Sequence, residues 1–403
     1  MKVLLISNAF PNSAEPVRGI FTYQIVKALQ KKCDIEVVAP LPWVPPFLRK
    51  KFLSQYPHAN VPAKEKIGDI QVHHPRYLVI PKILGFMHAV LMYFTLFKLV
   101  NSLENKGTID LINAHWIFPD GVAATWVGKI LKKPVVLTAL GCDINQYLSM
   151  ILRRIQISKA LKASNEITAK SSDLKNRIVS LGVLPQKVKV IPNGVDLDLF
   201  RIMDKGEARR RLGIQEDRPI ILTVGSQDQV KGTKYLIEAF HMISEKMKSS
   251  LQLVCIGDGP LRPILVSQVH GLGIADDVLF LGRKPHNEIP LWMNAADLFC
   301  LPSLREGHPN VVMESLACGI PIVASNVGSV PELINDSNGK ICIAGDSVGL
   351  SQMLFEALNI RWDRVSIRDN VKGDWEQCGH EYYKTYYAVL NRCQLHEPFG
   401  QRL

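Results

Sequence analysis

The 403-residue sequence lacks the cysteine pattern of a disulfide-stapled or zinc-binding protein. It contains eight cysteines, none of them in a Cys-x-x-Cys pair, and several stand inside apolar runs. Disulfide frameworks and structural zinc sites need cysteines at short, regular spacings. We therefore interpret the cysteines as reduced, buried thiols and expect a cytoplasmic protein without a metal site.

The sequence also lacks a Gly-x-Gly-x-x-Gly turn after its first apolar run, and it lacks an obvious export segment. The missing glycine pattern argues against a dinucleotide-dependent oxidoreductase. Only four apolar residues separate Lys2 from Ser7, whereas the apolar core of a signal peptide needs roughly 7–15 residues. This short run predicts a buried first strand.

One apolar stretch, residues 83–97, carries no charge. It is shorter than the ~20 residues that a membrane-spanning helix needs. Three interpretations stay open: a helix in the protein core, a helix that lies on a membrane surface, and a helix that spans a membrane. The short length argues against the third.

Positive charge is concentrated in the first half of the chain. Residues 1–200 contain 26 Lys and Arg against 13 Asp and Glu, a net of +13. The whole chain contains 48 against 37, so the remainder contains 22 against 24, a net of −2. Such a basic half indicates an anionic partner, which is a membrane surface, a phosphorylated acceptor or nucleic acid. No nucleic-acid-binding motif is present, so we exclude nucleic acid.

A basic cluster, Arg49, Lys50 and Lys51, precedes apolar residues at 52–53. Together with residues 83–98, this cluster gives the first half a surface that is both basic and apolar. Such a surface fits peripheral binding to an anionic membrane, here the inner face of the cell membrane. A cluster of solvated charges explains the same residues equally well.

Short apolar runs alternate with segments of helical spacing over residues 1–191, and the alternation restarts near residue 220. The predicted strands are 2–7, 35–39, 111–114, 135–139, 166–169, 188–191, 220–224, 252–256, 278–281, 298–301 and 321–324. The predicted helices include 21–31, 121–131, 172–181, 232–246, 261–272, 286–294 and 311–318. Such alternation is typical of parallel sheets covered by helices on both faces.

We therefore predict an α/β chain of two doubly wound, Rossmann-like domains that face each other across a cleft. The first domain covers residues 1–196 and the second covers 197–374, with a helix at 375–393 that packs back on the first. Ligands in such folds bind beyond the carboxyl ends of the strands. Loop residues at those ends are therefore the candidates for chemistry.

Residues 298–328 predict a strand, a loop, a helix and another strand. Asn310 is a good N-cap residue for this helix. The free N–H groups of Val311 and Val312 at the helix start suit a phosphate. Glu314 lies one turn into the helix on the same face as Asn310, where its carboxylate can accept both hydroxyls of a ribose. Glu306 precedes the helix and can reach a sugar on the other side of the phosphates.

This segment resembles the Glu-x7-Glu motif of family 4 retaining glycosyltransferases, which have the GT-B fold. Further family-like stretches are 113–116, 190–200, 224–232 and 256–260. The opening stretch 10–21 is similar to that of exopolysaccharide and teichuronic acid biosynthesis enzymes. The resemblance spans nearly the whole chain; it is specific for the family and weakly specific for the substrate.

The resemblance implies a set of site residues. Donor-binding residues would be Gly19, Ser226, Lys231, Arg283, Glu306, Asn310, Val311, Val312 and Glu314. Catalytic residues would be His115, Glu306 and Lys231, and Asp143 would contact the acceptor. His115 would lie near the transferred sugar, although a satisfied core histidine is the alternative.

The sequence departs from the family pattern at two of these positions. Ser226 stands where family members usually carry Arg, and Leu140 stands where they often carry His. The first change removes one cation from the phosphate site, and the second suggests a specialised acceptor pocket.

The resemblance predicts transfer of a sugar from a nucleoside-diphosphate-sugar, by default a UDP-sugar, to a hydroxyl of a cell-surface glycan or a lipid-linked acceptor. No carboxylate nucleophile is evident, which favours same-face attack with the departing phosphate as base. We expect no cofactor and a metal-independent reaction. The alternative is a non-catalytic sugar-nucleotide-binding scaffold. Ser226 and Leu140 allow this alternative, and the retention of Glu306 and Glu314 argues against it.

Overall fold

The computed structural model describes residues 1–45, 57–79, 82–215, 217–247, 251–371 and 373–395. The chain folds into two compact units. The first comprises Met1–Asn193 together with Trp375–Leu403, and the second comprises Gly194–Asp374. The second unit begins three residues before the predicted boundary, and the basic cluster at 49–51 lies outside the described residues.

The first unit is built on an eight-stranded sheet in the order β10-β9-β8-β7-β1-β2-β5-β4. Its strands are β1 (Lys2–Ile6), β2 (Asp34–Val38), β4 (Lys64–Ile67), β5 (Ile70–His73), β7 (Leu111–His115), β8 (Val135–Ala139), β9 (Glu166–Ala169) and β10 (Val188–Val190). All neighbouring pairs are parallel except β4 with β5. The α/β prediction is confirmed, and every predicted strand of this unit is found within one residue of its expected ends.

Four strands of the first unit were not predicted. They are β4, β5 and the two members of a small separate sheet, β3 (Leu41–Pro42) and β6 (Arg76–Tyr77). In β4 the sequence Lys-Glu-Lys-Ile leaves no buried side chain, because this strand is at the edge of the sheet. Strands that are exposed or very short carry no apolar run from which they could be recognised.

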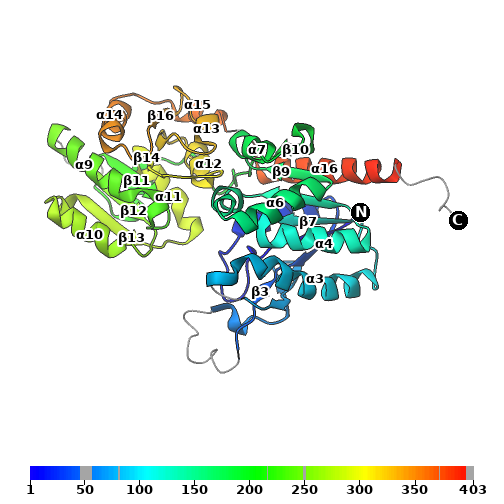
Figure 1. The fold of residues 1–403 in the computed structure, drawn as a ribbon. Coiled ribbons are helices and arrows are strands. Elements are labelled where there is room, and N and C mark those ends of the chain that lie inside the picture. Colours follow the sequence, from blue (N-terminus) through cyan, green and yellow to red (C-terminus); the bar gives the residue numbers. More distant parts are fainter. Residues whose placement is uncertain (46–56, 80–81, 216, 248–250, 372, 396–403) are drawn as a thin grey trace. The chain divides into compact units, whose positions relative to one another are not determined.

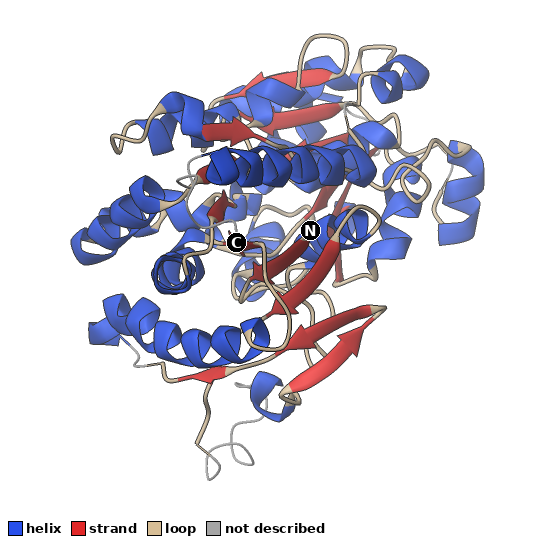
Figure 2. Ribbon diagram, turned by 90° about the vertical axis from the view of Figure 1, so that its right-hand side faces the viewer, coloured by secondary structure: helices blue, strands red, loops and turns tan. Residues whose placement is uncertain are grey.

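Helices cover both faces of the first sheet (Figures 1 and 2). On one face α1 (Ile20–Gln30) packs against α16 (Trp375–Leu395). On the other face lie α3 (His88–Glu104), α4 (Val122–Leu131) and α6 (Ile151–Ala163). Shorter helices are α5 (Cys142–Asn145) and α7 (Ser172–Val179).

The uncharged stretch at 83–97 forms the larger part of α3. The inward side of α3 is buried in the hydrophobic core at intervals of three and four residues, which is the spacing of one helix face. These buried residues are Ala89, Met92, Leu96, Val100 and Leu103. Leu84–Glu104 is also the single stretch of the described residues that is long and apolar enough to cross a membrane, a test that core helices pass as well. The helix therefore belongs to the core on one side and presents apolar residues on the other.

The second unit is built on a fully parallel sheet in the order β13-β12-β11-β14-β15-β16. Its strands are β11 (Ile220–Val224), β12 (Gln252–Ile256), β13 (Val278–Gly282), β14 (Leu298–Leu301), β15 (Ile322–Ser325) and β16 (Gly339–Cys342). Its helices are α8 (Lys205–Leu212), α9 (Thr233–Met247), α10 (Arg262–Gly271), α11 (Ile289–Ala295), α12 (Asn310–Ala317), α13 (Val330–Leu333), α14 (Ser347–Leu358) and α15 (Arg364–Asp369). The short strand β16 was not predicted, and the other five strands lie within one residue of their expected ends.

The last helix, α16, is anchored in the first unit by buried tyrosines. Tyr386 is fully buried and donates a hydrogen bond of 2.8 Å to Oδ1 of Asn113 in β7. The amide of Asn113 in turn donates to the backbone oxygen of Val136 at 3.0 Å. At Gly379 an added Cβ would lie 2.7 Å from Cβ of Ala28 in α1. The helix thus approaches α1 closely and completes the core of a unit from which it is distant in sequence.

Asp120 connects two loops at the carboxyl end of the first sheet. It is fully buried in the turn that follows β7, and its Oδ1 accepts the backbone N–H of Asn8, which follows β1, at 2.6 Å. Burial raises the pKa of Asp120 to about 8. The carboxyl group is therefore protonated between about pH 4 and pH 8, where a free aspartate is charged.

We expect Tyr386→Phe to destabilise the first unit by about 1–3 kcal/mol, because it leaves the buried Oδ1 of Asn113 without its donor. The matched control is Tyr387→Phe. Tyr387 is exposed on the same helix, so its loss should change stability by no more than about 0.5 kcal/mol. Urea unfolding followed by circular dichroism measures both effects. Equal midpoints for the two variants would contradict this role of the hydrogen bond.

We expect stability to depend on pH through Asp120. Because its pKa is higher in the folded chain than in the unfolded chain, the stabilisation from its protonated form is complete below about pH 4 and is lost as pH rises through about 8. The melting temperature of the wild type should therefore fall between pH 5 and pH 8 relative to that of Asp120→Asn, which cannot ionise. Parallel pH profiles of the two proteins would show that this carboxyl does not titrate as described.

Candidate functional site

The two predicted glutamates lie at the carboxyl edge of the second sheet, in the loop after β14 and in α12. The helix α12 begins at Asn310, so the prediction of Asn310 as N-cap is wrong. Pro309, with φ −77° and ψ 100°, occupies the capping position, which suits a residue without an N–H group to satisfy. The backbone oxygen of Pro309 accepts the N–H of Val312 at 3.0 Å. Of the two amides expected to face a phosphate, Val312 is thus already bonded within the first turn.

Glu306 forms an ion pair with Lys231 in this site. Oε1 of Glu306 lies 2.7 Å from Nζ of Lys231, and it also accepts the hydroxyl of Ser303 at 2.6 Å. Lys231 ends the 3-10 turn η6 (Gln229–Lys231) that follows β11. The two loops meet because β11 and β14 are neighbours in the sheet. The structure therefore brings together two residues that sequence analysis had proposed separately.

Glu314 has a histidine partner that sequence analysis missed. Its Oε1 lies 2.9 Å from Nε2 of His286 in the turn η8 (His286–Glu288). This hydrogen bond raises the pKa of His286, although burial acts in the opposite direction. The ring of Phe200 meets the imidazole edge to face at 5.2 Å. The available signal was the position of His286 just beyond β13, at the same edge of the sheet.

Glycines let the loops of the site approach one another backbone to backbone. A Cβ at Gly257 would lie 1.8 Å from the backbone oxygen of Gly225, and one at Gly259 would lie 2.4 Å from that of Gln227. At Gly232, which has φ 65°, a Cβ would lie 2.1 Å from the oxygen of Pro302. The family-like glycine positions are thus required by contacts between loops, which hold Lys231 beside Glu306.

Ser226 and Arg283 are placed differently from the two glutamates. The Ser226 hydroxyl donates to Oδ2 of Asp228 at 2.6 Å. Oδ1 of Asp228 accepts the backbone N–H groups of Val230 at 2.9 Å and Lys231 at 3.2 Å, so Asp228 shapes the turn that carries the lysine. Arg283 is exposed and makes no hydrogen bond or ion pair with the residues that the structure describes. Its prediction as a donor contact has no support from side-chain contacts.

Two site residues predicted for the first unit, Gly19 and His115, occupy constrained positions. Gly19 has φ 61°, and a Cβ there would lie 1.9 Å from the backbone oxygen of Ala9, so no other residue fits without a shift. His115 ends β7, is fully buried, and stacks on Tyr382 with 5.7 Å between ring centroids. Neither ring nitrogen has a hydrogen-bond partner among the described residues. Burial, together with the charge of Lys170, holds the pKa of His115 well below its usual value, so the imidazole is neutral.

Asp143, predicted as an acceptor contact, is instead a buried loop organiser. Its side chain is inaccessible to solvent, and its two carboxylate oxygens accept backbone N–H groups. The donors are Ile117 at 2.8 Å, Leu140 at 3.2 Å, Gly141 at 2.8 Å and Ile144 at 3.2 Å. A carboxylate so fully bonded is not available to a ligand in this structure.

Asp196 and Asp198 form an Asp-x-Asp pair in the linker, a spacing seen in some metal sites. Oδ1 of Asp196 accepts the N–H groups of Asp198 at 3.2 Å and Leu199 at 3.0 Å, so this side chain closes a local turn. Within the described ranges, no group of three or more His, Cys, Asp and Glu side chains has the geometry to hold a metal ion. The pair therefore acts as a turn former in this structure.

Comparison with known proteins places the chain in a family. Residues 19–199 match "Glycosyltransferase Family 4" and residues 204–372 match "Glycosyl transferases group 1". The chain is 31% identical over 341 residues to a protein of Bacillus subtilis described as a teichuronic acid biosynthesis glycosyltransferase, TuaC, with 83% of each covered.

Solved structures show the same fold. Sucrose-phosphate synthase from Thermosynechococcus elongatus is similar with a TM-score of 0.76 and 20% identity, over 97% of this chain and 100% of that one. HepE of Anabaena, in a complex with UDP, gives 0.73 and 20%, over 96% and 100%. The chain therefore belongs to the family 4 (group 1) glycosyltransferases, and its fold is of the GT-B class.

Proposed function

We propose that this glycosyltransferase moves a sugar from a UDP-sugar to a hydroxyl of a glycan or a lipid-linked acceptor, with retention of the anomeric configuration. The observation that carries the proposal is the pair of glutamates eight positions apart, each bonded to a basic partner. Glu306 pairs with Lys231 at 2.7 Å and Glu314 with His286 at 2.9 Å. HepE, a solved structure of the same fold, binds UDP and UDP-glucose, and TuaC is described as acting in teichuronic acid biosynthesis.

A donor that binds at this site has to break the ion pair of Lys231 and Glu306. A diphosphate is a stronger anionic partner for an ammonium group than one carboxylate, so an entering donor draws Lys231 toward its phosphates. Glu306 is then released to accept hydroxyls of the sugar. The pair thus keeps both charges compensated in the free enzyme and delivers each of them to a different part of the donor.

Glu314 is suited to the nucleoside. Its Oε1 is occupied by His286, and no partner is recorded for Oε2 among the described residues. A carboxylate oxygen in a largely buried position accepts ribose hydroxyls strongly because charged acceptors form the stronger hydrogen bonds. His286 orients the carboxylate for this contact.

Transfer breaks the bond between the anomeric carbon and the diphosphate oxygen, and the electron pair leaves with UDP. The acceptor oxygen forms the new bond from the same face, and its proton passes to the departing phosphate oxygen. Lys231 stabilises the charge that develops on the leaving diphosphate. This lysine supplies a cation at the point where a metal-dependent enzyme would use a metal, which supports a metal-independent reaction.

We expect Glu314→Ala to weaken UDP binding by roughly 10- to 100-fold, because it removes a charged acceptor of hydrogen bonds from a largely buried site. The control is Glu356→Ala, which changes an exposed glutamate of α14 in the same unit and should bind UDP like the wild type. Isothermal titration with UDP, GDP and ADP measures affinity and base preference together. Unchanged UDP affinity in Glu314→Ala would overturn the ribose assignment.

We expect Lys231→Ala to lower kcat by roughly 10²–10³-fold, because the lysine acts on the leaving-group charge. Lys234→Ala removes a nearby exposed lysine in α9 and should keep the wild-type kcat. Donor hydrolysis and transfer are followed by release of UDP, and the anomeric configuration of the product by NMR. An inverted product would exclude retention. A protein that binds UDP but neither hydrolyses nor transfers any donor would be the sugar-nucleotide scaffold instead.

A further inference from the structure

The outer surface of α3, α4 and α6 has an unusual charge balance. Residues 84–104, 122–133 and 151–163 together contain eight Lys and Arg against one acid, Glu104, a net of +7. That acid is already paired, since its Oε1 lies 2.7 Å from Nζ of Lys133. More than half of the net charge of +13 on residues 1–200 therefore comes from three helices on one face of one sheet together with the residues that flank them, which include Lys132 and Lys133 just after α4.

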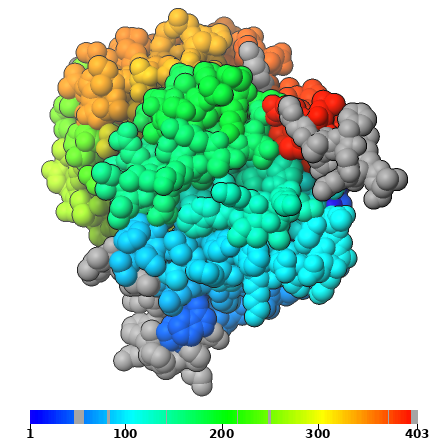
Figure 3. All heavy atoms as spheres, turned by 45° about the vertical axis from the view of Figure 1, so that its right-hand side comes forward, coloured from blue at the N-terminus to red at the C-terminus, as the bar shows by residue number. Residues whose placement is uncertain are grey.

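These three helices form a continuous surface. They share one hydrophobic core cluster, and α4 contacts both α3 and α6. Figure 3 shows them next to one another, in cyan to green, on one face of the first unit. Their outward side chains are thus presented together. We call this surface the α3-α4-α6 face.

Large apolar side chains project from the same face. Six of them are between 46% and 73% exposed: Phe94, Ile130, Met150, Ile151, Leu152 and Ile155. Four of the six are in or beside the first turns of α6, which therefore carries apolar side chains on its outward side as well as on its buried side. This arrangement also explains why sequence periodicity did not predict α6. Soluble proteins rarely group so many large apolar side chains on one surface without a partner.

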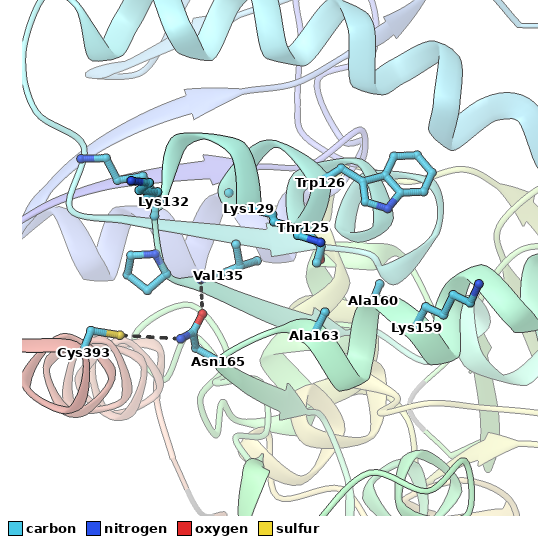
Figure 4. A pocket seen from close by; sticks show the side chains of 13 residues that line it. Thr125, Trp126, Lys129, Lys132, Val135, Lys159, Ala160, Ala163, Asn165 and Cys393 are labelled. Atoms are coloured by element: carbon cyan, nitrogen blue, oxygen red, sulfur yellow. Dashed lines mark hydrogen bonds between the residues drawn. The ribbon is translucent and has the colours of Figure 1, made fainter. Parts of the chain in front are cut away.

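A pocket of about 560 Å³ opens at the edge of this face, between α4 and α6 and beside Cys393 of α16. Its lining includes Lys129, Lys132 and Lys159, and Figure 4 shows Lys132 and Lys159 at opposite ends of it, with Lys129 between them and Trp126 toward the end of Lys159. None of these three lysines has a hydrogen bond or ion pair with another described residue. Asn165 fixes the floor, where it accepts the N–H of Val135 at 2.8 Å. Three lysines without such partners along a pocket attract an anionic group, such as the phosphate of a headgroup.

The pocket is separate from the candidate reaction residues. It borders Val135, the first residue of β8, whereas His115 is the last residue of the neighbouring parallel strand β7. Because parallel strands share their direction, a ligand in the pocket binds at the amino end of the sheet. A ligand in this pocket is therefore not expected to depend on a bound nucleotide-sugar donor.

We propose that the α3-α4-α6 face docks on an anionic lipid bilayer. The exposed apolar side chains enter the boundary between headgroups and acyl chains, and the pocket lysines hold the phosphate of a lipid headgroup. The mixture of apolar and basic residues favours a bilayer over a soluble polyanion, because the apolar side chains gain nothing from a purely ionic partner. The face would hold the enzyme at the inner surface of the cell membrane, whether or not the proposed transfer reaction is correct.

Sedimentation of the full chain with vesicles tests this proposal. We expect binding to vesicles of phosphatidylcholine with about 30% phosphatidylglycerol, and little binding to phosphatidylcholine alone. Two double variants test the apolar and the basic residues of the face separately. Ile151→Ser with Ile155→Ser removes apolar contacts, and Lys129→Gln with Lys159→Gln removes pocket charges. Each should weaken binding by about tenfold or more. The control, Lys234→Gln with Lys246→Gln, removes the same charge from α9 and should bind like the wild type.

Three results would overturn the proposal. One is equal vesicle binding by the wild type and both face variants. The second is equal binding of the wild type to neutral and anionic vesicles. The third is failure to bind vesicles while a single-stranded RNA binds and Lys129→Gln with Lys159→Gln weakens that binding, which would identify a nucleic-acid surface.

Two further measurements keep the test independent of folding and of catalysis. Circular dichroism and melting temperature verify that each variant is folded, and Ile151→Ser alone replaces the double variant if that one is unstable. UDP affinity, measured in solution, should be the same in all variants as in the wild type. A variant that loses vesicle binding but still binds UDP has its defect on the α3-α4-α6 face. If the wild type itself does not bind UDP, that result contradicts only the proposed function.

Discussion

Backbone contact between the loops after β11, β12 and β14 is the constraint on which the candidate site depends. At Gly232, Gly257 and Gly259 an added Cβ would lie only 1.8–2.4 Å from a backbone oxygen of a neighbouring loop. This close approach sets the position of the turn that carries Lys231, and hence its 2.7 Å contact with Glu306. A parallel sheet gathers its loops at one edge, and glycine lets these loops touch.

The charges of Lys231 and Glu306 compensate each other before any ligand arrives. Removing one partner from a largely buried pair leaves an unmatched charge, which is costly. The ion pair of Glu306 with Lys231 avoids that cost in the free protein, and His286 gives Oε1 of Glu314 a hydrogen-bond partner. In the proposed reaction, a diphosphate that draws Lys231 away would make Glu306 available to the sugar, so that binding of the two parts of the donor would be coupled.

Much of this architecture could be predicted from the sequence because the central strands are buried on both faces and read as apolar runs. The two glutamates could be placed because they flank a helix start. The partners could not be predicted in the same way. His286 is 28 residues from Glu314 and reaches it through the fold of the sheet. The family resemblance implied an acceptor contact for Asp143, but only the folded loop shows that four backbone N–H groups converge on its oxygens.

The edge strand β4 of the first sheet was not predicted because it contains no buried apolar run. In β4 charged residues alternate along an exposed strand, and nothing in their hydropathy distinguishes such a strand from a loop. Helix α6 was not predicted for another reason. It has apolar residues on both sides, so its apolar residues do not recur only at the three- and four-residue spacing by which a helix is recognised. In both cases the sequence did not show whether a side chain points to solvent or to the core.

The return of α16 to the first unit has a consequence for synthesis of the chain. Its tyrosines fill the core beside β7 and α1, yet they are made some 180 residues after the rest of that core, since the second unit comprises Gly194–Asp374. On the ribosome, where domains fold as they emerge, the unit that is encoded first is therefore completed last. Until α16 emerges, the apolar surface that it covers stays open, and the second unit can fold while its neighbour still waits for its final helix.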